Sequence, residues 1–432
     1  MENNNNRRLL IIIGFVIFFV IIVLVWYFVY AKPITAPSLN ETYNPFPSER
    51  NSPRSQFIGR EWNTGSSTSE TEVIDPLSQP LIRIWDRPTS GQTFIVSQVL
   101  KEITATSSEG TSTILVKRTV RATSTTVLFV DKITGYVYGY SVETGEVFQI
   151  SNSVLPGIHD AYIFNNGKRV LMRYLDQEKN VIVGIIATIP NNSNKDNPLP
   201  LENIEYLTGE VTSIAVNDDS SEASYVVTTD NGSTVYTVMT SDQPKFVASS
   251  PFREWTISYG GNSLYVTTKP SAYVEGSTFS VPGFQSELAE KTGLMTLPNS
   301  SGGFLSSMWG KQGLATFFYN NGDARVVPFK TLSLKCTFGE EDLLVCAIPR
   351  KIPKTTEGLP DDWFQGRMFF EDDLFVIDKT SGDTYPLYTF SEKDGVFDIT
   401  TIIISEKNDL FSFLKKQDES LWLLNTNLLE EN

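Results

Sequence analysis

The chain has 432 residues, with 50 acidic and 35 basic side chains and a formal net charge of −15 at pH 7. A surface this acidic repels phosphate backbones, so binding of nucleic acid is excluded as a function class. The chain contains two cysteines and one histidine, too few for the usual closed zinc site. We therefore expect no metal and no cofactor.

The N-terminus predicts a membrane anchor. The run from Leu9 to Tyr30 is free of charged residues, and as a helix it is about 33 Å long, enough to cross the hydrocarbon core. Arg7 and Arg8 precede it, so the positive-inside rule places residues 1–8 in the cytoplasm and the rest of the chain outside. A cleaved signal peptide is the alternative, although its apolar core is usually shorter. The prediction is a single-pass protein of the cell membrane.

Residues 31–79 are rich in Pro, Ser, Thr and Asn and nearly free of apolar runs. Such a segment buries too little surface to offset its ordering entropy, so we expect a mostly disordered linker. The linker leads to a predicted ectodomain, residues 80–432, outside the cytoplasm.

The ectodomain predicts an all-β fold. Short runs of Val, Ile, Tyr, Phe and Thr alternate with Gly, Asn and Asp, as in "VLFVDKITGYVYGYS" from Val127 and "DLFSFLKKQDESLWLL" from Asp409. A recurring unit of about 40 residues with four antiparallel strands is the blade of a β-propeller. We predict about seven four-stranded blades from Ile103 to Asn425, with a pair of β-sandwiches as the alternative.

Two details of this propeller can be predicted. The segment "PLIRIWDRPTSGQTFIV" near Leu81 is expected to supply the missing outer strand of the last blade, which would close the ring and remove an exposed edge. The only plausible helical turn is "QSELAEK", from Gln285 to Lys291.

Catalytic motifs are absent from the sequence. His159 has no G-x-S-x-G motif to act with, so an inter-blade hydrogen-bonding role is favoured over a catalytic one. Phosphate-binding loops are missing as well. "TTDNGSTV", from Thr228, approaches an Asp box of sialidase-type propellers, but it occurs once and is explained by the Asn-Gly hairpin turn. We predict no catalytic residue.

Cys336 and Cys346 lie in "KCTFGEEDLLVCAI". A hairpin centred on Glu341 would place them directly opposite each other, where Cα atoms are about 4.5 to 5.5 Å apart and a disulfide can form. Such a bond would contribute about 2 to 3 kcal/mol. Two reduced, buried thiols are the alternative, because a register shifted by two residues would make the cysteines diagonal neighbours.

The best candidate for a binding surface is "TTEGLPDDWFQGRMFFEDD", from Thr355 to Asp373, predicted as an insertion between strands of the sixth blade. Large aromatics next to charges on a loop are typical of binding hot spots. In the alternative interpretation the tryptophan folds back over the blade and the acids cap a turn. The predicted partner-binding residues are Asp361, Asp362, Trp363, Phe364 and Arg367.

The anchor, the Pro-rich linker, "KCTF…LLVCAIP", "PDDWFQG" and "DESLWLL" together resemble a group of bacterial membrane-anchored proteins with TolB-like or WD-repeat-like propeller ectodomains. The resemblance spans most of residues 80–425. It implies the fold and the membrane topology, and it implies no activity.

Three functions follow as hypotheses. The first is a non-enzymatic, membrane-anchored propeller that binds proteins or glycans of the cell envelope as a scaffold. The second is a propeller glycosidase or lyase acting on envelope polysaccharide, which would need two carboxylates facing each other across the channel. The third is a structural component of a surface appendage or secretion complex.

Overall fold

The computed structural model describes residues 78–109, 112–176, 180–191, 197–239, 243–320, 322–339 and 343–429, with only the backbone of residues 100–109 and 112–120. The predicted cytoplasmic tail and membrane helix, and all but the last two residues of the linker, lie outside these ranges and stay predictions. Within the described ranges no helix is both long enough and apolar enough to cross a membrane. The described residues belong to one compact unit, Val73–Asn432.

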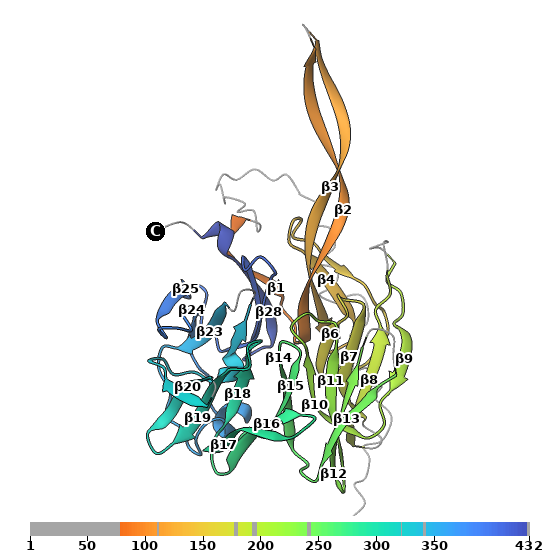
Figure 1. Cartoon of the computed structure of the whole chain (residues 1–432). Helices are drawn as coiled ribbons and strands as arrows, with labels where there is room; N and C mark the ends of the chain where they lie inside the picture. The colour runs from red at the N-terminus through yellow and green to blue at the C-terminus, as the bar shows by residue number, and fades with distance from the viewer. Residues whose placement is uncertain are drawn as a thin grey trace, which may run out of the picture. The chain divides into compact units, whose positions relative to one another are not determined.

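The described strands form seven four-stranded antiparallel sheets, which confirms the predicted seven-bladed β-propeller (Figure 1). The first three blades are β2 (Thr89–Glu109), β3 (Ser112–Asp131), β4 (Val137–Ser141) and β5 (Val147–Gln149); β6 (Ile158–Phe164), β7 (Arg169–Asp176), β8 (Val181–Thr188) and β9 (Glu202–Tyr206); and β10 (Glu210–Val216), β11 (Ala223–Thr229), β12 (Gly232–Val238) and β13 (Lys245–Ser250). In each blade the first strand is the inner one.

The next three blades follow the same order along the chain. They are β14 (Trp255–Gly260), β15 (Ser263–Thr268), β16 (Glu275–Val281) and β17 (Gln285–Thr292); β18 (Met295–Pro298), β19 (Phe304–Gly310), β20 (Gly313–Asn320) and β21 (Asp323–Val326); and β22 (Cys336–Phe338), β23 (Leu344–Pro349), β24 (Asp372–Ile377) and β25 (Thr384–Tyr388). Three short helical segments accompany the strands: η3 (Ser333–Lys335), α2 (Asp361–Phe364) and η5 (Thr426–Leu428).

The seventh blade closes the ring with strands from both ends of the ordered chain. Its strands are β26 (Ile399–Ile404), β27 (Leu410–Lys415), β28 (Ser420–Asn425) and β1 (Leu81–Trp85). β1 pairs antiparallel with β28, with Leu81 opposite Leu424, and the Asn425 amide donates to the Pro80 carbonyl at 2.8 Å. The prediction that the segment near Leu81 supplies the outer strand is confirmed.

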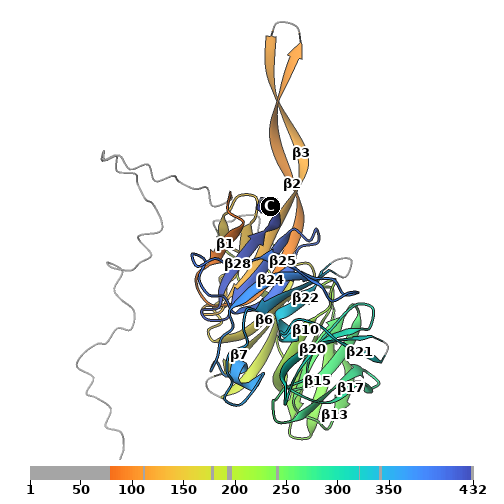
Figure 2. The same cartoon turned by 90° about the vertical axis from the view of Figure 1, so that its left-hand side faces the viewer.

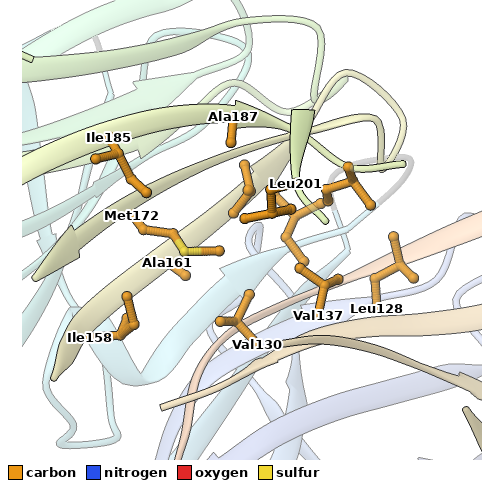
Figure 3. Packing of buried hydrophobic residues seen from close by; sticks show 12 residues of the cluster. Leu128, Val130, Val137, Ile158, Ala161, Met172, Ile185, Ala187 and Leu201 are labelled. Carbon is orange, nitrogen blue, oxygen red and sulfur yellow. The ribbon is translucent and has the colours of Figure 1, made fainter. Parts of the chain in front are cut away.

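The hydrophobic core is a ring of layers, each lying between adjacent blades. In one layer Leu128, Val130 and Val137 of the first blade pack against Ile158 and residues of the second (Figure 3). Equivalent clusters join the remaining neighbouring blades, including the seventh to the first. Because each sheet is apolar on both faces, a single blade could not bury its apolar side chains without its neighbours.

Two sequence predictions need correction. Residues 285–291 belong to strand β17, where Ser286 pairs with Phe279 of β16, and Leu288 is buried. Their Glu, Leu, Ala and Lys favour a helix, but sheet pairing and inter-blade packing override that preference. The first blade begins at Thr89 rather than at Ile103.

The first blade carries an extension that the sequence did not predict. Strands β2 and β3 have 21 and 20 residues, whereas the longest other described strands have eight. From the pair Ser97 and Ser124 to the pair Glu109 and Ser112, the two strands pair only with each other among the described strands. We call residues 97–109 and 112–124 the ribbon. It is about 40 Å long, and Figures 1 and 2 show it extending away from the blades.

Candidate functional site

The predicted binding residues lie on the loop of residues 350–371, which connects β23 to β24 in the sixth blade as expected. This 350–371 loop contacts both the fourth and the fifth blade. The Ala272 amide in the fourth blade donates to Asp361 Oδ2 at 2.5 Å. A Cβ on Gly358 would lie 2.5 Å from Trp309 Nε1 of the fifth blade, so the loop lies tightly against that blade.

Asp362 holds this loop in shape. Its side chain is buried, and its Oδ2 accepts hydrogen bonds from the amides of Thr356 at 2.6 Å, Glu357 at 3.0 Å and Gly358 at 3.3 Å. Arg367 Nη1 lies 3.2 Å from Asp362 Oδ1. Burial acts to raise the pKa of Asp362, but these backbone bonds and the Arg367 charge outweigh it and hold the pKa below its usual range. The acid caps a turn, which is the alternative weighed from the sequence.

Replacing Asp362 with Asn is expected to destabilise the protein in a pH-dependent way. A carboxyl whose pKa is lowered by folding stabilises the native state above its unfolded pKa, and this contribution is lost as the pH falls through the folded value. Asp362→Asn should therefore lower the urea midpoint at pH 7, and by progressively less as the pH falls below the usual carboxyl range. Urea titrations from neutral to strongly acidic pH check this, and a loss that does not change with pH would contradict it.

Trp363 is also buried, with 4% of its surface exposed. Its Nε1–H donates to both carboxylate oxygens of Asp398, at 2.9 Å to Oδ2 and 3.2 Å to Oδ1, at the beginning of the seventh blade. Trp363 and Asp362 therefore fix the 350–371 loop, as in the alternative interpretation weighed from the sequence. Binding of a partner by these two residues stays a prediction.

The exposed part of the predicted site is smaller than expected. Phe364 is 48% exposed, and the Arg367 side chain is 37% exposed while pairing with Glu357 at 2.7 Å. Tyr273, whose neighbour Ala272 bonds to Asp361, is 66% exposed and was not singled out in the sequence. Binding of a partner by Phe364 and Arg367 stays a prediction.

Beneath this loop lies a buried charge cluster that sequence reasoning missed. Lys335 ends η3, directly before the inner strand β22, and its side chain has no exposed surface. Its Nζ lies 2.7 Å from Asp372 Oδ2 and is ion-paired with Asp398 Oδ1. Both carboxylates are also fully buried. We call Lys335, Asp372 and Asp398 the buried triad.

Aromatic rings surround the triad. The Lys335 Nζ lies 4.8 Å from the ring centre of Phe370 and 5.4 Å from that of Trp363. Burial raises the pKa of Asp372 to about 6, and the nearby Lys335 charge opposes this only in part. Asp372 Oδ1 is buried and has no hydrogen-bond partner among the described residues.

Next to Lys335, the two cysteines are paired as the hairpin argument expects. Cys336 lies directly opposite Cys346 in the register of β22 and β23. Their Cα atoms are 4.0 Å apart and their sulfur atoms are joined in a disulfide. The bond fastens the inner strand of the sixth blade to the strand from which the 350–371 loop departs.

Among the described residues, the polar contacts of His159 lie within its own blade. Its side chain is 59% exposed and its Nδ1 lies 3.6 Å from Asp160 Oδ2 in the same strand. The inter-blade role belongs to Arg173, which donates to the carbonyls of Val211 at 3.2 Å and Thr212 at 2.5 Å in the third blade. Among the described residues, no group of three or more His, Cys, Asp or Glu could hold a metal ion.

A cavity of about 280 Å³ lies between the fourth and fifth blades. Its lining is Glu287, Leu288, Ala289, Lys291, Gly302, Phe304, Tyr319, Asn320 and Gly322. Glu287 is its only carboxylate, so the cavity lacks the two facing carboxylates that a glycosidase needs.

No protein-family model matches the chain, and no curated protein matches it. Solved structures that are similar to it include the β-propeller domain of the Trilobed protease from Pyrococcus furiosus, with 10% identity, a TM-score of 0.44, and coverage of 72% of this chain and 95% of that one. Oligogalacturonate lyase from Vibrio parahaemolyticus is 10% identical, with a TM-score of 0.43 and coverage of 77% of this chain and 98% of that one. Hydrazine synthase from Kuenenia stuttgartiensis is 10% identical, with a TM-score of 0.42 and coverage of 64% of this chain and 79% of that one. At this similarity nothing about activity carries over. The seven four-stranded sheets establish the chain as a seven-bladed β-propeller protein.

Proposed function

We propose that the chain is a non-enzymatic, membrane-anchored scaffold that binds a protein of the cell envelope through the ribbon of its first blade. The anchor and the location outside the cytoplasm rest on residues 9–30 and their basic flank. The ribbon is the observation that supports binding: two strands leave their sheet together, and no third strand among those described pairs with them there.

Exposed strand edges favour a protein partner over a glycan. Along the ribbon both outer edges present backbone N–H and C=O groups that no described strand pairs. A two-stranded ribbon is marginally stable alone in water. An extended peptide can add to such an edge and satisfy its backbone groups. At the base of the ribbon Val96 and Val99 are 45% and 41% exposed.

The glycosidase hypothesis has no comparable support. One pair of carboxylates that come together beneath the 350–371 loop, Asp372 and Asp398, is fully buried against Lys335. A sugar could not reach them without unfolding the loop. The third hypothesis, a structural component, differs from the scaffold in that the ribbon would pair with further copies of the chain.

Shortening the ribbon tests the proposal. Residues 99–122 are replaced by Asn-Gly, which closes the paired Gln98 and Thr123 with a two-residue turn. The variant is expected to melt within a few degrees of the wild type and to lose the envelope proteins that co-purify with the full chain from native membranes. The matched control is the double variant Phe364→Ala/Arg367→Ala, which should keep them.

Two outcomes would contradict the proposal. If the shortened chain captures the same proteins as the wild type, the ribbon is not the binding element. If the control loses them while the shortened chain keeps them, binding belongs to the 350–371 loop. A native gel distinguishes the structural-component hypothesis from the scaffold. If the ribbon pairs with further copies of the chain, the full chain should self-assemble on the gel and the shortened chain should not.

A further inference from the structure

We propose that Lys335 and Asp398 are joined by an intramolecular amide bond, which the chain forms by itself between Nζ of Lys335 and Cγ of Asp398. The reacting groups are already in contact, since the Lys335 Nζ is ion-paired with Asp398 Oδ1. The bond would link the residue before β22 in the sixth blade to the residue before β26 in the seventh.

Burial favours this reaction over a lasting ion pair. With both carboxylates ionised, the buried triad carries a net negative charge in a site with no exposed surface, and such charges are costly to remove from water. Amide formation proceeds when one proton has passed from the Lys335 Nζ to Asp398. Its product is a neutral amide, which is better tolerated than a pair of charges among the rings of Trp363 and Phe370.

The surroundings of Asp398 suit a carboxyl under attack. Its Oδ2 accepts a hydrogen bond from Trp363 Nε1 at 2.9 Å and another from the Phe370 amide at 3.1 Å. Two fixed N–H donors on one oxygen stabilise the negative charge that develops there as the tetrahedral intermediate forms. After the reaction the same oxygen is the amide carbonyl and keeps both donors. Oδ1, on the side of Lys335, is the oxygen that leaves.

Asp372 is placed to carry the proton. Its Oδ2 lies 2.7 Å from the Lys335 Nζ, and its Oδ1 has no partner among the described residues. Burial raises its pKa to about 6, so near neutral pH the group takes up and releases a proton readily. Asp372 would accept a proton from the attacking nitrogen and deliver it to the leaving oxygen of Asp398.

The reaction balances without a cofactor. The Nζ–Cγ bond forms, the Cγ–Oδ1 bond of the protonated Asp398 breaks, and one amine proton reaches the leaving oxygen through Asp372. One water is released, and nothing is oxidised or reduced. Trp363 and Phe370 shield the site from bulk water, which disfavours the reverse hydrolysis.

Mass spectrometry of the full chain tests the proposal directly. After reduction of the Cys336–Cys346 disulfide, the purified chain should weigh one water, about 18 Da, less than its sequence requires. Digestion should release a branched peptide in which Lys335 is joined to Asp398. A chain of full mass would overturn the proposal. So would a loss of water located elsewhere, at Asp394 before Gly395 as a cyclic imide or between Lys335 and Asp372.

Variants separate the roles. Lys335→Met should have full mass. Asp372→Asn keeps the size of the side chain and should fold while forming little or none of the bond; complete bonding in this variant would overturn the role of Asp372. Lys416→Met is the matched control, because the Lys416 Nζ lies 4.5 Å from the Trp363 ring centre but outside the buried triad. It should retain the loss of water.

Discussion

A chain that begins at Arg87 is expected to lose cooperative folding, whereas a chain that begins at Ser78 is expected to fold like the full ectodomain. The first truncation removes β1 and the second removes none of the described strands. β1 completes the seventh blade by pairing with β28, and its Leu81 and Ile84 are buried in two different inter-blade clusters.

The size of the effect follows from these two side chains. Truncating a buried Leu or Ile costs about 2 to 5 kcal/mol, so losing both approaches the total of about 5 to 15 kcal/mol that stabilises a typical domain. Removing β1 also leaves the edge of β28 open, which favours aggregation. Differential scanning calorimetry of the two truncated chains measures the loss.

Restoring the strand provides the control. A peptide of residues 78–88 added to the chain that begins at Arg87 should bring back a cooperative transition, because it supplies the same pairs with β28. If the two truncated chains melt at the same temperature, β1 does not close the ring. The pairing of β1 with β28 in the seventh blade would then need revision.

Trp363→Ala is expected to be the most damaging single substitution in the 350–371 loop. It removes a buried aromatic side chain, at a cost of about 3 to 5 kcal/mol, and deletes the donor that bonds to both oxygens of Asp398. Leaving the buried Asp398 oxygen without this donor costs about 1 to 3 kcal/mol more. Urea denaturation followed by circular dichroism, which does not depend on Trp363 fluorescence, measures the loss.

Phe364→Ala is the matched control for this substitution. Phe364 is the next residue and is also a large aromatic, but it is 48% exposed, so its loss should cost about 1 kcal/mol or less. Equal destabilisation by the two substitutions would contradict the conclusion that buried Trp363 stabilises the loop by packing and by bonding to Asp398. A Trp363→Ala chain as stable as the wild type would contradict it as well.

Local patterns were sufficient to predict the blades. Each blade is a repeat of strand, polar turn and strand, and the pairing of Cys336 with Cys346 follows from the turn between them. The closing strand could be predicted because the last blade lacked a fourth strand, and the segment near Leu81 was the apolar run left over. Alternation over Gln285–Thr292 is weak, and its helix-forming residues predicted the wrong element there.

The ribbon and the buried triad could not be predicted in this way. The ribbon has the composition of ordinary strands, and nothing local fixes how far two strands continue after the third has ended. Lys335 lies between Leu334 and Cys336 with no acidic residue beside it, and Asp398 lies 63 positions later in the chain. Only the packing of the sixth blade against the seventh brings them together. The sequence did suggest that Trp363 could fold back, but not which partner it would bond.

The proposed role of the ribbon as the binding element of a scaffold can be tested by crosslinking mass spectrometry of the full chain in the cells that produce it. The ribbon contains two lysines, Lys101 and Lys117, which lie on different strands near its middle. If the ribbon binds the partner, crosslinks to other envelope proteins are expected to concentrate on these two lysines. Crosslinks that avoid them and gather on lysines of the blades would contradict it.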